Sequence, residues 1–154
     1  MTLDLKFRKL GNHSLIPNLA EYAKDQMASH DDCKIYVGSD SQNNSNSTKL
    51  ATVVVFHYGN NGAHVAYRTL SLPKMNDEFS RLWFEVTSSM EIAQYLKELG
   101  LKVSHVDLDL NEDEHFKSNA VLRSAVGYVE SMGFSPRWKP HNADACRVAD
   151  ALCR

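Results

Sequence analysis

Cysteine is scarce in this sequence, because its 154 residues include three, an odd number with no CxxC pair. Such a count argues against a disulfide framework and indicates a reducing compartment. The close ligand spacing of zinc sites is also missing. No apolar run approaches the roughly 20 residues of a membrane span, and the N-terminus lacks the apolar core of a secretory signal. We therefore expect a cytoplasmic protein without membrane segments.

A strong excess of charge of either sign is missing as well. Seventeen Lys and Arg against 19 Asp and Glu give a formal net charge of -2. A basic balance would have favoured phosphate binding through counterion release, so the charge neither supports nor excludes a nucleic-acid partner. The hydrophobic content of 43% and the charged content of 23% are those of an ordinary globular protein. The length predicts one domain over residues 1–154.

Apolar periodicity predicts five strands and four helices. The first helix belongs to an N-terminal helical extension, residues 1–30, and has Ser14 as its expected cap. A polar loop is expected over 41–48, and the run Gly59-Asn60-Asn61-Gly62 predicts a hairpin. The expected strands cover 33–39, 50–58, 64–72, 101–110 and 134–139, and the expected helices cover 14–29, 77–99, 118–132 and 143–152.

The expected order is β-β-β-α-β-α-β-α, with the extra helix in front. Three strands in meander order, followed by strands that alternate with helices, predict a mixed sheet flanked by helices. This is the layout of the ribonuclease H-like architecture. The sequence therefore predicts an α/β fold around a mixed five-stranded sheet.

The segment KIYVGSDSQ, residues 34–42, leads from an apolar strand to the carboxylate of Asp40. A carboxylate that faces inward from a strand of Ile, Tyr and Val is costly unless a positive group pairs with it. Because no Lys or Arg follows before Lys49, a bound cation is a candidate partner. The alternative is that Asp40 starts a turn, as Asp commonly does.

Further acids lie on the fourth strand and on the long helix. If the first and fourth strands are adjacent and parallel, Asp40 and Asp109 come together near their ends. Asp107 points to the same face as Asp109 and is a competitor deeper in the strand. On the helix, Glu85 shares the apolar stripe expected to face the sheet, whereas Glu91 lies among polar residues. We therefore favour Glu85 over Glu91.

The last helix carries two more acids, Asp144 and Asp150. Asp144 is explained by the favourable interaction of an acid with a helix N-terminus. Asp150 has no such local explanation, since Asp is a poor helix former in mid-helix. It is therefore the better candidate ligand.

An acid-only cluster of this kind suits hard cations. Mg²⁺ and Mn²⁺ prefer carboxylate and water oxygens, and two such ions can activate a water and stabilise the leaving oxygen of a phosphodiester. Each acid alone is typical of a solvated surface, but together they indicate a metal site. The four candidate ligands are Asp40, Glu85, Asp109 and Asp150.

Several distinct short motifs are spread over residues 33–154. They are IYVGSDSQ, the spaced helix residues Arg81, Glu85, Ser89 and Ala93, the strand HVDLDLN, the helix start KSN, and the closing KP and VADALCR. In combination they resemble the YkuK-like family of predicted ribonuclease H-related nucleases. The resemblance implies a ribonuclease H-like fold and a metal-binding cluster of Asp40, Glu85, Asp109 and Asp150.

The sequence thus predicts a divalent-metal-dependent nuclease that hydrolyses phosphodiester bonds in RNA, RNA/DNA hybrid or structured DNA with two Mg²⁺ or Mn²⁺ ions. The alternative is a non-catalytic module that uses the same fold to hold nucleic acid or a protein. Several polar residues could bond to phosphates or to metal-bound waters near the acids. They are Ser41, Gln42, Asn111, Ser118, Asn119 and Lys139.

Overall fold

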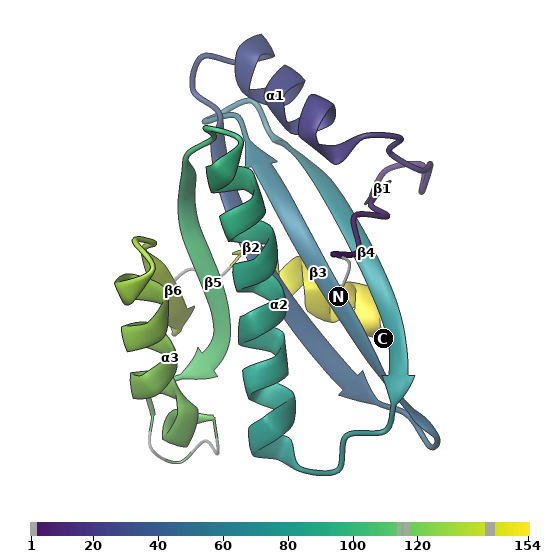
Figure 1. Ribbon diagram of the computed structural model, residues 1–154, viewed down its shortest axis with the longest axis vertical. Helices are drawn as coiled ribbons and strands as arrows, with labels where there is room; N and C mark the ends of the chain where they lie inside the picture. Colours follow the sequence, from purple (N-terminus) through teal and green to yellow (C-terminus); the bar gives the residue numbers. More distant parts are fainter. Residues whose placement is uncertain (1–2, 114, 116–117, 141–143) are drawn as a thin grey trace.

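The computed structural model describes residues 3–113, 115, 118–140 and 144–154. Within them the chain forms one mixed sheet of six strands and four helices (Figure 1). In chain order the elements are β1 (Arg8–Lys9), α1 (Leu19–Ser29), β2 (Lys34–Asn43), β3 (Ser47–His57), β4 (Ala63–Pro73), α2 (Glu78–Glu98), β5 (Val103–Asn111), α3 (Asn119–Ser131), β6 (Pro136–Lys139) and α4 (Asp144–Cys153).

The order of strands across the sheet is β1-β4-β3-β2-β5-β6. Strands β2, β3 and β4 form the expected antiparallel meander, and the reversal between β3 and β4 falls at residues 59–62 as predicted. Strand β5 pairs with β2 in parallel, and β6 pairs with β5 in parallel. The last pair between β2 and β5 is Gly38 with Asp107. Beyond it the two strands are no longer paired, and this is where Asp40 and Asp109 lie.

Helices cover both faces of the sheet. In Figure 1, α2 and α3 lie in front of it and α4 lies behind. The larger apolar core joins Val37 and Phe56 of the sheet to Ile92 of α2 and Val129 of α3, and it also includes residues of α1. On the other face, Ala149 of α4 belongs to a smaller core with residues of β2, β3 and β4.

Gly38 determines how closely α4 approaches β2. A Cβ at this position would lie 2.8 Å from the Ala145 Cβ and 3.1 Å from the Cys146 backbone nitrogen. Neither neighbour is the flexible end of a long side chain, so only glycine allows the first turn of α4 to rest directly on the strand. Side chains alternate along a strand, and Asp40, two residues later, therefore faces the same side as α4.

Two expectations about the strands are wrong. Residues 41–48 are not a polar loop, because β2 continues to Asn43 and β3 begins at Ser47, with the Asn44 N–H donating to the Ser47 carbonyl (2.8 Å). Asp40 therefore lies within a strand rather than at its end. Hydrogen bonds replace apolar contacts here: the buried Thr48 hydroxyl donates to Asn43 (2.5 Å) and accepts from the Met75 N–H (2.8 Å).

The N-terminal segment also differs from expectation. Helix α1 begins at Leu19, because the side chain of Asn18, not Ser14, caps it by accepting a hydrogen bond from the Glu21 N–H (3.1 Å). The residues before α1 form β1, a sixth strand that pairs with β4. Because β1 has two residues, it is too short to show an apolar periodicity in the sequence.

At the C-terminal end, the predicted helix start at residue 143 lies outside the described residues. No described helix is long and apolar enough to cross a bilayer.

Candidate metal centre

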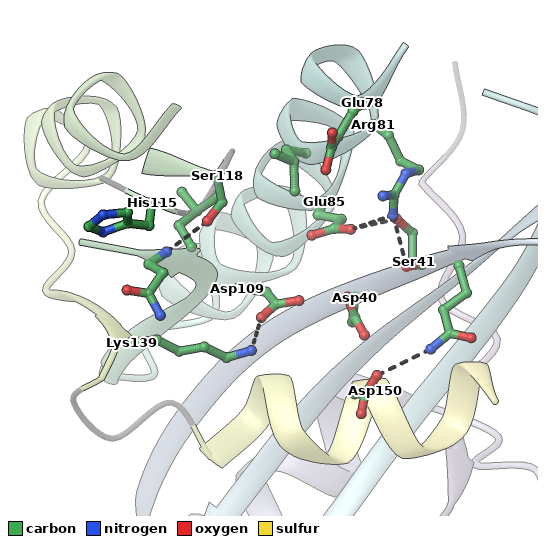
Figure 2. Close-up of a pocket in the computed structure, with 14 residues that line it drawn as sticks. Asp40, Ser41, Glu78, Arg81, Glu85, Asp109, His115, Ser118, Lys139 and Asp150 are labelled. Atoms are coloured by element: carbon green, nitrogen blue, oxygen red, sulfur yellow. Dashed lines mark hydrogen bonds and ion pairs between the residues drawn. The ribbon is translucent and has the colours of Figure 1, made fainter. Parts of the chain in front are cut away.

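Three carboxylates from three elements meet where β2 and β5 separate. Asp40 of β2, Asp109 of β5 and Glu85 of α2 each offer an oxygen, and these oxygens lie within 4.8 Å of one another. Figure 2 shows Asp40 and Asp109 side by side in the sheet, with Glu85 coming from α2. Asp40 and Glu85 are buried, with 5% and 4% of their surfaces exposed. The structure therefore brings together three of the four acids singled out from the sequence.

Glu85 is held in place by the strand that it approaches. The Ser41 hydroxyl donates to Glu85 Oε2 (2.5 Å), and Arg81, one turn earlier on α2, lies 3.6 Å from the same oxygen. Arg81 also donates to the carbonyl and the hydroxyl of Ser41, at 3.0 and 2.9 Å. These contacts connect α2 to β2 at the site and fix the direction of the Glu85 carboxylate.

Asp150, the fourth acid, approaches from the opposite layer. It lies on α4 and lines the same cavity as Asp40. Gln42 of β2 donates to one of its oxygens (3.2 Å) (Figure 2). Arg154 pairs with the other oxygen (2.7 Å). Asp40 thus lies between Asp150 on one side and Glu85 and Asp109 on the other.

A cavity of about 630 Å³ opens over the four acids. Lys139, the last residue of β6, forms an ion pair with Asp109 inside it. Four of the polar residues proposed to bind substrate also line the cavity: Ser41, Gln42, Asn111 and Ser118. The cavity therefore combines a carboxylate floor with hydrogen-bonding walls.

Burial controls the protonation of the two inner acids. Burial, followed by the neighbouring Asp109 and Glu85, raises the pKa of Asp40 to about 9. Burial likewise raises the pKa of Glu85 to about 8, although the Ser41 hydrogen bond and the Arg81 charge oppose it. Without a cation, the folded protein therefore holds extra protons here near neutral pH.

These shifts predict how stability depends on pH. Both folded pKa values lie above the ordinary values of 3.8 and 4.5. The contribution of the two groups to stability is thus complete below about pH 4 and is lost as pH rises through about 8 and 9. In EDTA, we expect the free energy of unfolding to fall by at least about 1 kcal/mol between pH 6 and 8.

Urea unfolding at the two pH values measures this fall. Excess Mg²⁺ should reverse the fall, because a cation favours the ionised carboxylates. The Asp40→Asn protein, which lacks one of the two titrating groups, should show a shallower dependence. An identical slope in both proteins would contradict the assignment to Asp40.

Asp107, the competitor of Asp109, has a different environment. Its carboxylate is fully buried and accepts two hydrogen bonds from Arg137 of β6, at 2.7 and 2.8 Å. It also accepts one from the Ala145 N–H at the start of α4 (2.9 Å). Asp107 thus joins β5, β6 and α4, and its oxygens already have protein partners.

The two other competitors lie away from the cluster. Glu91 is 55% exposed and lies 3.7 Å from Arg68. Asp144 is 46% exposed and lies 3.8 Å from Arg147 on its own helix. Neither of them lines the cavity over the acids.

The turn after β5 accounts for three of the polar residues. The Asn111 N–H donates to the Ser118 hydroxyl (2.9 Å), and the Asn119 amide donates to the Glu112 carbonyl (2.9 Å). These bonds connect the end of β5 to the start of α3. Asn119 does not line the cavity over the acids. Lys117, the first residue of the KSN motif, lies outside the described residues.

Sequence reasoning missed two residues of the site. Glu78 lines the cavity from the first turn of α2, and its signal is the seven-residue spacing to Glu85, which places both on one helix face. Arg154 pairs with Asp150 four residues earlier, a spacing typical of helical ion pairs.

The donor set fits a hard divalent cation. The three clustered ligand atoms are all carboxylate oxygens, a fourth carboxylate, that of Asp150, lines the same cavity, and no described Cys or His belongs to the cluster. Oxygen-only sites of this kind are typical of Mg²⁺ and Mn²⁺.

A family model described as "Ribonuclease H-like" matches residues 15–154. Among solved structures, the chain is similar to the RNase H1 of the halophilic archaeon Halobacterium salinarum NRC-1, with 16% identity and a TM-score of 0.39 over 77% of this chain and 98% of that one. It is also similar to the N-terminal RNase H domain of Rv2228c from Mycobacterium tuberculosis, with 14% identity and a TM-score of 0.34 over 79% and 96%. No curated protein matches.

Proposed function

Because the chain belongs to the ribonuclease H-like family, we propose that it is a divalent-metal-dependent nuclease that hydrolyses phosphodiester bonds. The substrate class is RNA, RNA/DNA hybrid or structured DNA. Assignment to the YkuK-like branch of the family is part of this proposal and rests on the sequence motifs described above.

One observation carries the proposal: acids distant in sequence converge on one point. Asp40, Glu85 and Asp109 belong to three separate elements, yet their oxygens lie within 4.8 Å of one another. Bringing several carboxylates together in a buried place is costly unless a cation neutralises them. A site that keeps this arrangement is therefore suited to divalent ions.

The four acids would divide the binding of two ions between them. Asp40 lies next to Glu85 and Asp109 on one side and next to Asp150 on the other, so it is the ligand that both ions would share. Ser41 and Arg81 hold Glu85, and Gln42 holds Asp150. Bound ions of this kind supply activation of the attacking water and stabilisation of the leaving oxygen.

The walls of the cavity are suited to a nucleic-acid backbone. Gln42, Asn111 and Lys139 line it and carry amide or ammonium donors, and such donors commonly bind phosphate oxygens. Contacts of this type do not distinguish bases. We therefore expect recognition through the backbone and its shape rather than through sequence.

A panel of labelled nucleic acids tests the proposal. The purified protein should cut at least one of single-stranded RNA, RNA/DNA hybrid, single-stranded DNA and branched DNA in Mn²⁺ or Mg²⁺, and EDTA should abolish the cutting. Gel analysis of the products measures it, and calorimetry with Mn²⁺ measures metal binding in parallel.

The result that would overturn the proposal is also clear. A folded protein that binds Mn²⁺ and cuts no member of the panel would favour the non-catalytic binding module. A folded protein that binds no Mn²⁺ would contradict the assignment of the metal centre as well.

A further inference from the structure

Lys139 is the cation that contacts the acid cluster from β6. Its ammonium forms an ion pair with Asp109 Oδ1, and 47% of its side chain is exposed. Asp109 is also one of the three clustered carboxylates. The lysine therefore contacts a carboxylate that a divalent ion would use as a ligand.

Arg81, which also lines the cavity, is held differently. Its side chain is 20% exposed, and its guanidinium contacts Glu85 and two oxygens of Ser41. Arg81 is thus fixed between helix and strand. Among the described residues, Lys139 forms an ion pair with Asp109 alone, and its charge sits on a flexible four-carbon stem. Of these two cavity-lining cations, Lys139 is the one that can leave its partner without breaking a network.

A divalent ion bound at the cluster and the Lys139 ammonium would both bind the carboxylate of Asp109. Their like charges repel strongly at close range in a partly buried site. When an ion binds, Lys139 must turn away, and its charge then requires another partner. The cavity that Lys139 lines is the place where the phosphates of a bound nucleic acid would lie.

We propose that Lys139 is an exchangeable cation that occupies Asp109 while the site holds no metal and moves to a substrate phosphate when a divalent ion binds. This inference rests on the proposed nuclease function. The exchange makes metal and nucleic acid bind cooperatively. A bound ion repels the Lys139 ammonium from Asp109, and a bound phosphate offers the displaced ammonium a new partner. By linkage, each ligand raises the affinity of the other by the same factor.

The substitution Lys139→Met tests the exchange, because it should change the Mn²⁺ affinity and the nucleic-acid affinity in opposite directions. Without nucleic acid, removal of the competing ammonium should raise the Mn²⁺ affinity about tenfold, as measured by calorimetry. With a phosphorothioate version of the panel member that the wild type cuts, the affinity of the Mn²⁺-loaded protein should fall about tenfold, as measured by fluorescence anisotropy.

Two matched variants complete the experiment. Lys139→Arg keeps the charge and should retain most of the wild-type behaviour in both measurements. Lys102→Met removes an exposed lysine just before β5, at the end of the strand away from Asp109, and should change neither. A purely structural role for Lys139 predicts that both affinities fall in Lys139→Met, which would overturn the inference.

The result separates this inference from the proposed function. If the wild type binds Mn²⁺ and cuts nucleic acid, but Lys139→Met binds Mn²⁺ no more tightly, the exchange is wrong and the nuclease stands. If no nucleic acid is cut, the nuclease is wrong. In that case, the Mn²⁺ affinities of the wild type and Lys139→Met without nucleic acid still test whether Lys139 competes with the ion at Asp109.

Discussion

Replacing Asp40 by Asn is expected to lower phosphodiester cleavage at least about a thousandfold and to stabilise the metal-free protein. Cleavage falls because Asp40, the proposed shared ligand, lies beside Glu85 and Asp109 in the cluster and lines the same cavity as Asp150. Stability rises because the substitution removes a buried group whose pKa is raised to about 9. At pH 8 in EDTA we expect the thermal midpoint to increase by about 2–4 °C, equivalent to about 1 kcal/mol.

The matched control is Asp144→Asn, the same change at an exposed acid at the start of α4. Both rates are measured at saturating Mn²⁺, and both midpoints are measured in EDTA. The control should cut at the wild-type rate and show no gain in stability. If Asp40→Asn keeps substantial activity in Mn²⁺, Asp40 is not a metal ligand of the reaction.

Replacing Asp107 by Ala should have the largest effect on folding. This substitution leaves the guanidinium of Arg137, 15% exposed, without its carboxylate, and it also removes the acceptor of the Ala145 N–H. Breaking a buried ion pair on one side costs about 3 kcal/mol or more. The thermal midpoint should therefore fall by about 6–12 °C in a chain of this size.

The corresponding change two residues later should behave in the opposite way. Asp109→Ala should preserve the metal-free stability to within about 1 kcal/mol, because its ion pair with Lys139 is partly exposed, and it should abolish cleavage. The double change Asp107→Ala with Arg137→Met should regain part of the lost stability, since no unpaired charge remains. A stability loss in Asp109→Ala as large as that in Asp107→Ala would contradict this division of roles.

The layout of the fold could be predicted from local patterns. The meander, the alternation of strands and helices, and the cap at Gly100, where φ is +83°, follow from periodicity and turn residues. The missed elements lack such patterns: β1 has two residues, and the extensions of β2 and β3 are polar. The two buried polar side chains there, Ser41 and Thr48, bond to partners from other segments, Ser41 to Glu85 and Thr48 to Met75.

Candidate site residues could be predicted where the direction of a side chain follows from the periodicity of its own helix or strand. Glu85 could be separated from Glu91 because the apolar stripe of a helix is visible in the sequence. Alternation alone could not decide between Asp107 and Asp109, since both point to the same face. The difference comes from Arg137, and which β5 residue it meets depends on the register of β6, which no local pattern encodes.

The four acids around the cavity come from every layer of the molecule. Glu85 comes from the helix in front of the sheet, Asp40 and Asp109 come from the sheet itself, and Asp150 comes from the helix behind it. An ion bound there would cross-link the three layers. The packing of α2 and α4 on the sheet would then be coupled to ion binding. The concentration of divalent ions around the protein would therefore influence how rigidly the three layers are held together.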